Sequence, residues 1–397
     1  MYSAALSTRV CLGALRMGNK EYFHFGFALP STAARILSTA PLLLKDLDKP
    51  LKQWTFEVSP FSKVNVKLRC DLSVRPLDPH DFPEADRAFI SVHGTNVDHE
   101  FNLDNLHVHY SDQNKELLIH GDKVTSNVTV ELTTPIKSDL FITTSGEGNV
   151  NIQKMESDVC KVQTERGNCI LTSLRGGGTH KGPSGSCKGG LESHQVKVLS
   201  AGGNITGFGT IHGNVDVCAK EGSEVDIKKI QGSFMNVSTE RGQLKVKAIY
   251  AESSKVSSSS GEIQLGHIHG EANVQSEMGN VRVDSSSGAL KISTASGNID
   301  TYVGDVGSAD LTTLQGSVSV RVPASMKAGV QLSGASVEIS PEIKLHAAQH
   351  DCSDSGTTVS GYLNGPSAGD QWIKVKADEG TISLRAQSWF ESLRLGK

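Results

Sequence analysis

Five histidines that lie close together in the sequence are the residues of this chain best suited to metal chemistry. His107 and His109 alternate, so in a strand their imidazoles would share one face, and His93, His99 and His120 lie nearby. Imidazole nitrogens are common zinc ligands, but no acid or cysteine accompanies these residues at ligand spacing. We therefore interpret them as exposed strand histidines, and we predict no catalytic residues, no metal site and no cofactor.

A second chemical candidate is a Gly/Ser-rich insert at residues 175–190. Glycine-rich loops cradle phosphates when they lead into a helix, but the insert lacks the Gly-x-x-x-x-Gly-Lys-Ser/Thr pattern, and no helix is predicted after it. A loop bulging from the fold is the better interpretation.

The cysteines do not predict a disulfide framework. They are odd in number, widely spaced and free of Cys-x-x-Cys, which favours unpaired thiols in a reducing compartment. The seven are Cys11, Cys70, Cys160, Cys169, Cys187, Cys218 and Cys352.

The elements that must position any site are set by a repeat of glycines, each followed by apolar residues two and four places later. One series includes Gly242, Gly261 and Gly279, at spacings of 18 to 20 residues, and a second includes Gly213 and Gly232. Two interleaved series of one period indicate two short strands and two turns per repeat. The sequence therefore predicts an all-β fold: a two-strand-per-coil β-solenoid with coils of about 19 residues.

The same pattern predicts what the corners and outward faces contain. Glycine readily adopts a positive φ, and the recurring Gly-Asn pairs suit tight turns. His267 and His269 are predicted as turn residues in this scheme. A polysaccharide-cleaving solenoid would need carboxylates or basic residues clustered on neighbouring coils of one face, and the positions three residues after each glycine show no pair of acids on adjacent coils. The positions inspected are Thr206, Lys245, Gln264, Arg282, Asp300 and Ser319 in one series, and Asp216, Asn273, Lys291 and Asp310 in the other.

The repeat divides the chain into four parts. Residues 1–44 carry four basic residues and a single acid and are predicted to be a mitochondrial transit peptide and linker, with processing near Leu37. A secretory signal and an unstructured terminus are the alternatives. Residues 51–135 form a smaller N-terminal β region that covers the solenoid end, residues 136–345 the solenoid, and residues 346–397 C-terminal strands with an amphipathic cap.

The composition excludes some partners. The net charge is −4 and the body of the chain has no basic run, so nothing favours nucleic acid. No apolar stretch is long enough to be a membrane helix.

Four sequence runs resemble known proteins. They are Trp54 to Phe61, Arg75 to Pro79, Met278 to Gly288 and Gln387 to Leu395, and they are similar to the vertebrate family named "family with sequence similarity 185". The glycine repeat itself resembles the putative-adhesin domain. These resemblances imply a β-solenoid and a mitochondrial address, and they supply no catalytic residues.

These observations favour a non-enzymatic binding or scaffold protein that holds an unidentified protein partner on its long faces. The alternative is an enzyme that acts on carbohydrate, with its site in the N-terminal β region or in its loop from Arg75 to His80. A deep pocket lined by His107, His109 and Asp104 would favour this alternative. The predicted location is mitochondrial, with secreted and cytosolic proteins as the alternatives.

Overall fold

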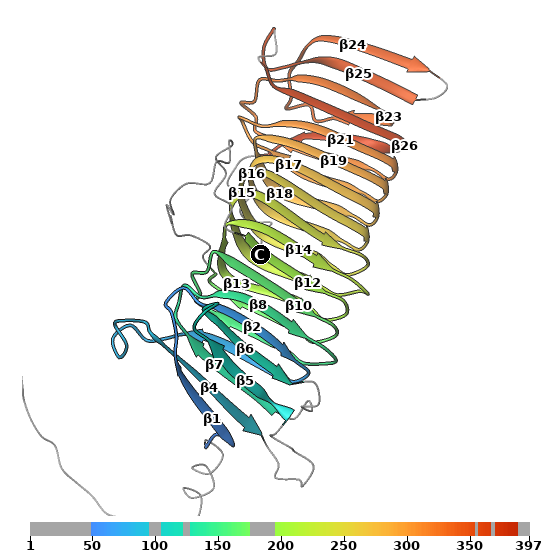
Figure 1. Ribbon diagram of the computed structural model, residues 1–397. Helices are drawn as coiled ribbons and strands as arrows, with labels where there is room; N and C mark the ends of the chain where they lie inside the picture. The colour runs from blue at the N-terminus through green and yellow to red at the C-terminus, as the bar shows by residue number, and fades with distance from the viewer. Residues whose placement is uncertain are drawn as a thin grey trace, which may run out of the picture. The chain divides into compact units, whose positions relative to one another are not determined.

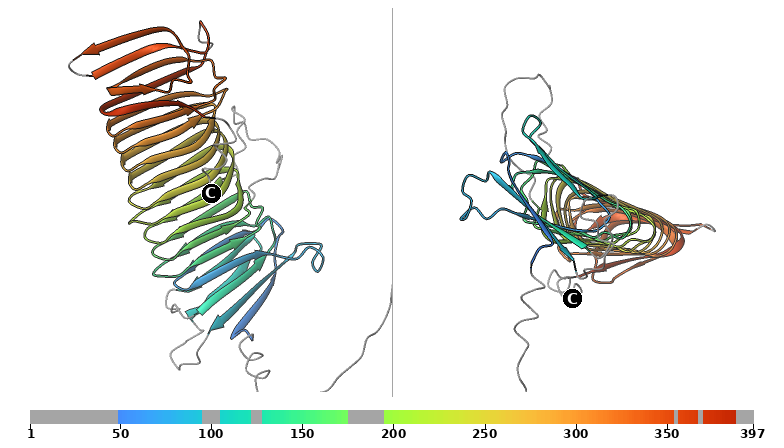
Figure 2. Two further views of the ribbon diagram at one scale, coloured as in Figure 1. Left: turned by 180° about the vertical axis from the view of Figure 1, so that it is seen from behind. Right: turned by 60° about the horizontal axis from the view of Figure 1, so that its bottom comes forward.

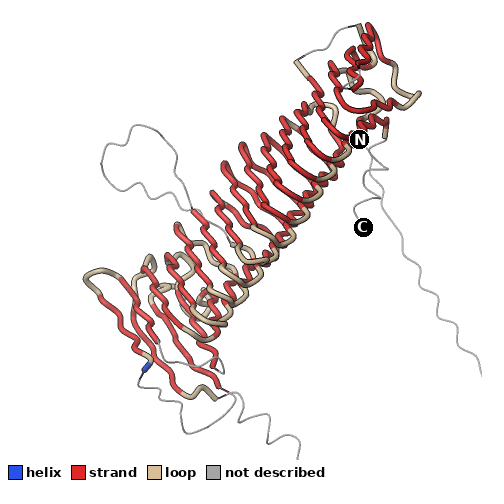
Figure 3. The backbone as a smooth tube through the Cα atoms, turned by 90° about the vertical axis from the view of Figure 1, so that its right-hand side faces the viewer, coloured by secondary structure: helices blue, strands red, loops and turns tan. Residues whose placement is uncertain are grey.

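A computed structural model describes residues 49–94, 105–121, 128–174, 195–353, 356–366 and 370–387 of this chain. The predicted transit peptide, the Gly-rich insert and the amphipathic segment after Gln387 lie outside these residues. The residues from Leu47 onward belong to one compact unit. Its described part is built of β-strands and contains no α-helix, which confirms the all-β prediction. Figure 1 shows these strands stacked along one axis, and Figure 3 shows loops mainly at the edges of the stack.

Each coil contributes one strand to each of two faces. The chain runs along face 1, turns a corner, returns along face 2, and turns again into the next coil. Parallel pairing places Val225 beside Leu244, Leu244 beside Ile263, and Ile263 beside Val281. These steps of 19, 19 and 18 residues confirm the predicted two-strand coil. Figure 2 shows the coils superposed around a shared interior.

The strands of face 1, in order along the stack, are β1 (Lys52–Glu57), β4 (Arg87–Gly94), β7 (Val128–Thr134), β3 (Asp71–Pro76), β9 (Val150–Gln153), β11 (Cys169–Thr172), β13 (Ile205–His212), the first halves of β15 (Val225–Thr239), β16 (Leu244–Ser260) and β17 (Ile263–Met278), then β18 (Val281–Ser287), β20 (Ile299–Val303), β22 (Val318–Val322) and the second halves of β26 (Trp372–Ala386) and β23 (Gly329–Ile339).

Face 2 consists of β5 (His107–Ser111), β6 (Glu116–Gly121), β2 (Lys63–Leu68), β8 (Asp139–Thr144), β10 (Val159–Thr164), β12 (Gln195–Ser200), β14 (Asn214–Ala219), the second halves of β15, β16 and β17, then β19 (Ala289–Ser296), β21 (Ser308–Gln315), the first halves of β26 and β23, β25 (Gly356–Leu363) and β24 (Leu345–Ser353).

Alternation along each strand creates the core. The inward side chains of successive coils form continuous columns, and Val225, Leu244, Ile263, Val281 and Ile299 in one column are at most 1% exposed. Each contributes about 2 kcal/mol through burial. Because the inward column continues from coil to coil, the core is a long row of Val, Ile and Leu.

The corner glycines are required mainly by close approach. A Cβ on Gly242 would lie 1.9 Å from the backbone oxygen of Ser223, and one on Gly167 would lie 1.9 Å from the oxygen of Gly148. Neither Gly167 nor Gly242 has a positive φ. The predicted explanation by positive φ is therefore wrong for these two positions, because the backbone of one coil packs directly on the next.

The Gly-Asn pairs form a ladder between coils. The Asn149 side-chain oxygen accepts a hydrogen bond from the Asn168 backbone, and Asn168 accepts one in turn from Asn204, each at 2.9 Å. Further along, Asn298 accepts a 2.8 Å bond from the Ser317 backbone. The asparagines thus satisfy backbone N–H groups of the following coil, a role beyond the predicted tight turn.

Hydroxyl side chains line the inside of the same corner. Thr239 donates to the oxygen of Gly242, three residues later, and Ser276 makes the same contact with Gly279. Both hydroxyl residues are buried. A Ser or Thr stands three places before most glycines of this series, and this contact explains the pattern.

At both ends of the stack, strands distant in sequence are inserted between coils. β2 and β3 lie between the β6–β7 coil and the β8–β9 coil, and β26 lies between the β21–β22 coil and β23. The strands before residue 135 pair directly with those after it, so one sheet runs across the predicted domain boundary.

Candidate binding groove

A groove of about 730 Å³ lies over face 1, where the face 1 halves of β16 and β17 turn toward face 2 and where β18 and β20 end. Outward side chains at the ends of parallel strands meet at one edge of a sheet, and here they are aromatic, imidazole, hydroxyl and carboxyl groups. The lining includes Tyr250, His267, His269, Ser287, Tyr302, Asp305 and Gln387.

One wall of the groove is a column of side chains from successive coils. Tyr250 and His269 are register partners whose rings stack, with centroids 4.5 Å apart and planes inclined by 11°. Lys229 Nζ lies 4.6 Å from the Tyr250 ring centroid, and Ser287 Oγ shares a 2.8 Å hydrogen bond with His269 Nδ1. Stacking and cation–π contacts hold this wall in one arrangement.

His267 and His269 lie within strand β17, so the prediction of turn residues is wrong. Gln231, Tyr250 and His269 occupy equivalent positions in successive coils, as their pairing shows. The strand continues through this position because each of these residues pairs with both neighbouring coils.

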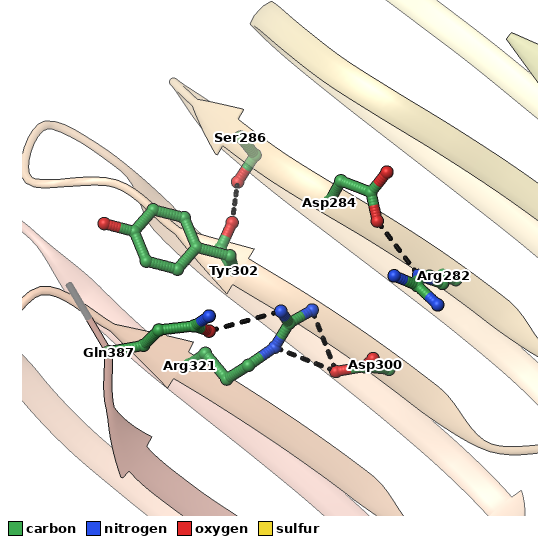
Figure 4. A network of polar contacts seen from close by, with 7 residues as sticks. All are labelled: Arg282, Asp284, Ser286, Asp300, Tyr302, Arg321 and Gln387. Carbon is green, nitrogen blue, oxygen red and sulfur yellow. Dashed lines mark hydrogen bonds and ion pairs between the residues drawn. The ribbon is translucent and has the colours of Figure 1, made fainter. Parts of the chain in front are cut away.

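The other wall rests on a buried arginine (Figure 4). Arg321 is 9% exposed, and its guanidinium contacts Asp300 Oδ1 through Nε at 3.1 Å and Nη2 at 3.0 Å. Its Nη1 donates to Gln387 Oε1 at 3.2 Å, which fixes the Gln387 amide at the groove. A buried guanidinium needs such partners, so the pair with Asp300 is an integral part of this wall.

Tyr302 supplies a hydroxyl to the groove. Burial raises the pKa of its phenol, the Asp305 carboxylate raises it further, and Arg321 acts in the opposite direction. The phenol therefore remains protonated at neutral pH and can donate a hydrogen bond to a ligand. Its backbone oxygen accepts a 3.4 Å bond from Ser286, which ties β20 to β18 (Figure 4).

The groove has the chemistry of binding more than that of catalysis. Ser287 and His269 are in contact, and a serine nucleophile would need the imidazole to be oriented by a third group. Within the described part of the chain, no carboxylate is hydrogen-bonded to the second ring nitrogen of His269. The hydrogen bond between Ser287 and His269 is therefore best interpreted as a structural contact between neighbouring coils.

The described histidines among those singled out in the sequence lie on strands β4, β5 and β6. His107 and His109 are exposed on β5, and His120 on β6 is the register partner of His107. His93 lies on β4 beside Ser91, and His99 and Asp104 lie outside the described residues. No group of His, Cys, Asp and Glu among the described residues could hold a metal ion.

The described cysteines are all unpaired. Burial raises the pKa of the Cys70 and Cys160 thiols to about 12, with Asp71 and Asp139 respectively adding to the effect. Burial also raises the pKa of Cys169. These three thiols stay protonated and are unreactive core residues. Cys11 and Cys187 lie outside the described part of the chain.

The sequence inspection missed Tyr302 and Arg321 for a simple reason. A strand alternates with period two, so the residue five places after each glycine also faces outward. That second row contains Phe208, Lys247, Gly266, Asp284, Tyr302 and Arg321. Reading two residues further along each coil would have found both groove residues.

A two-faced coil stack with a polar groove defines the class of protein: a parallel β-solenoid with a groove over one face. Residues 89–385 match the family described as Toastrack DUF4097. This match covers well over half of the chain, so the protein belongs to the Toastrack DUF4097 family.

Several solved structures are similar to the chain at low identity. A putative adhesin from Parabacteroides merdae is 12% identical, with 86% of this chain and 98% of that chain covered and a TM-score of 0.34. A putative lipid binding protein from Parabacteroides distasonis is 12% identical, with coverages of 85% and 96% and a TM-score of 0.31. A putative cell adhesion protein from Clostridium sporogenes is 13% identical, with coverages of 85% and 100% and a TM-score of 0.16. The family assignment rests on the matched residues and not on these likenesses.

No helix formed by the described residues has the length and apolarity needed to cross a bilayer.

Proposed function

We propose that this chain is a non-enzymatic binding protein whose solenoid holds a protein partner in the face 1 groove. The observation that carries this proposal is the groove lining. Tyr250 is 39% exposed, and it lines the same groove as the protonated Tyr302 phenol and the fixed Gln387 amide. Tyrosines with a few placed polar groups are typical of protein-binding surfaces.

The rigidity of the groove supports the same function. Tyr250, His269 and Tyr302 stand on strands that pair on both sides, and the two walls are held by ring stacking and by the Arg321 contacts. A surface that is already ordered loses little conformational entropy on binding. Binding therefore needs no rearrangement of the coils.

The proposal is tested by placing a photo-crosslinking amino acid at Tyr250 in the full chain expressed in cells. The matched control position is Asn236, which is also exposed but lies on face 2. We expect a defined protein adduct from position 250 that disappears when Tyr302→Phe and Gln387→Ala are added. Equal crosslinking from both positions, or none from position 250, would contradict the proposal.

The subcellular location of the protein is the subject of a separate proposal. We propose that the chain is a mitochondrial member of the vertebrate family with sequence similarity 185, supported by the basic leader and by the unpaired thiols. Expression of the full chain in cells should yield a form shortened near Leu37, and Arg35→Ala should impair that processing. A glycosylated product of full mass in the secretory pathway would contradict the mitochondrial location.

A further inference from the structure

Four lysines gather on face 1 although they are spread over 20 residues of sequence. Lys228 and Lys229 belong to β15, and Lys245 and Lys247 belong to the next coil, β16. Parallel pairing brings them together across strands about 4.8 Å apart. The paired segments 225–231 and 244–250 also carry one acidic residue, Asp226, which is the register partner of Lys245. We refer to the four lysines as the lysine patch.

The arrangement of the patch is unfavourable for the isolated protein. Lys228 and Lys247 lie side by side, between the register pairs Ile227 with Val246 and Lys229 with Ala248. Like charges on directly neighbouring strands cost stability. No lysine of the patch has an ion pair within the described residues. An anionic partner would remove this repulsion.

Exposed aromatic side chains border the patch on the same face. Phe208 is 43% exposed, with Lys228 Nζ 5.5 Å from its ring centroid, and Tyr250 is 39% exposed beneath Lys229. Flanking residues on the neighbouring coils are neutral, namely Thr206, Thr210, Gln264 and Gly266. The patch is therefore a compact positive area with an apolar side chain on each flank.

The residue types indicate which anion is bound. All four cations are lysine, a hydrated point charge on a flexible stem, whereas paired recognition of single carboxylates or phosphates favours arginine. Lysine is also depleted in protein–protein interfaces. Lysines beside exposed aromatic residues are typical of surfaces that lie on anionic bilayers, where the charges face headgroups and the rings enter the interface.

We infer that the lysine patch, with Phe208 and Tyr250, docks the face 1 side of the solenoid on an anionic lipid bilayer. This inference shares Tyr250 with the proposed protein-binding groove, but the four lysines and Phe208 that carry it do not line that groove. Each lysine near an anionic surface contributes about fivefold in affinity. The interaction should weaken as ionic strength rises.

The test is co-sedimentation of the full chain with vesicles. One set contains phosphatidylcholine alone, and in the other about one third of the lipid is phosphatidylserine. We expect binding to the anionic vesicles only. Lys228→Gln with Lys247→Gln should weaken it about 25-fold. Phe208→Ala should weaken it further.

The matched control is Lys255→Gln with Lys291→Gln. These lysines are exposed on face 2, and their replacement changes the net charge equally. The control should bind like the parent chain, and thermal melts of both double variants should coincide. Equal loss in both double variants, or no binding to anionic vesicles, would overturn the inference. Binding to polyglutamate or an oligonucleotide in preference to vesicles would overturn it in favour of a soluble polyanion.

Discussion

In the middle of the stack each coil pairs with the next coil along the chain, whereas at both ends a distant segment is inserted between two coils. In the middle, β15, β16 and β17 follow one another in register, and their corners share glycine contacts and hydroxyl contacts. At the ends, β2, β3 and β26 take positions that depend on pairing with strands far away in sequence. The middle is therefore stabilised by pairing between coils that are neighbours in sequence. The ends are stabilised by long-range strand pairing, which carries the entropic cost of closing long loops.

The largest expected effect is at the C-terminal end. A chain ending at Gln371 lacks β26, whose side chains Ile373, Val375, Ile382 and Leu384 are at most 3% exposed. Its removal leaves unpaired edges on both neighbouring coils, and such edges aggregate. We expect loss of soluble monomer by size-exclusion chromatography. A chain ending at Gln387 should stay monomeric, and a monomeric product from both truncations would show that β26 does not hold this end together.

A smaller effect is expected at a corner in the middle. Gly242→Ala forces a Cβ against the Ser223 backbone, so neighbouring coils must separate. Gly222→Ala is the matched control, because no atom lies within 4 Å of its added Cβ and only its φ of 82° is unfavourable. The control should cost about 1–2 kcal/mol in the free energy of unfolding. Gly242→Ala should cost more in urea denaturation; a smaller cost would mean that the coils can move apart easily.

The asparagine ladder should contribute less per rung. Asn298→Ala removes the acceptor of the Ser317 backbone N–H, and the expected cost is about 0.5–1.5 kcal/mol in the same denaturation measurement. Asn298→Asp retains an acceptor oxygen and should cost less. If Asn298→Ala has the same free energy of unfolding as the parent chain, water replaces the hydrogen bond to the Ser317 backbone.

The smallest effect is a pH dependence near the N-terminal end. Burial raises the pKa of Asp139, opposed mainly by the hydrogen bond from the Val159 backbone. Because the folded pKa lies above the unfolded one, this group stabilises the fold at low pH, and its contribution is lost as pH rises through the folded value. Asp139→Asn should therefore be slightly more stable than the parent chain at neutral pH and show a flatter stability profile in melts across pH. A stability profile that is steeper for Asp139→Asn than for the parent chain would contradict a raised pKa for Asp139.

The repeat predicted the fold well because its signal is local. The Gly, Asn and Ser/Thr positions that identify a coil are the same residues that contact the next coil, so Thr239, Gly242 and Asn298 carry the architecture in the sequence. The inserted strands could not be predicted in place. The position of β2 between β6 and β8 is determined by pairing across loops.

The groove and the lysine patch were missed for a related reason. Their residues come from neighbouring coils, and residues 19 apart do not form a run in the sequence. Lys228 and Lys247 are adjacent only in the stack. Once the coil length is known, reading the outward rows across coils would find both surfaces.

The most direct test of the two-strand coil is a pair of deletions within the middle of the stack. Removing Ser233 to Ala251 takes out one full coil and joins equivalent corners, because Gly232 and Ala251 are register partners. Removing Glu271 to Gly279 takes out one face of one coil and places a face 1 strand where a face 2 strand belongs. Measured by soluble yield and far-ultraviolet circular dichroism, the full-coil deletion should retain the β-type spectrum and the half-coil deletion should lose it. Equal loss in both proteins would contradict the account.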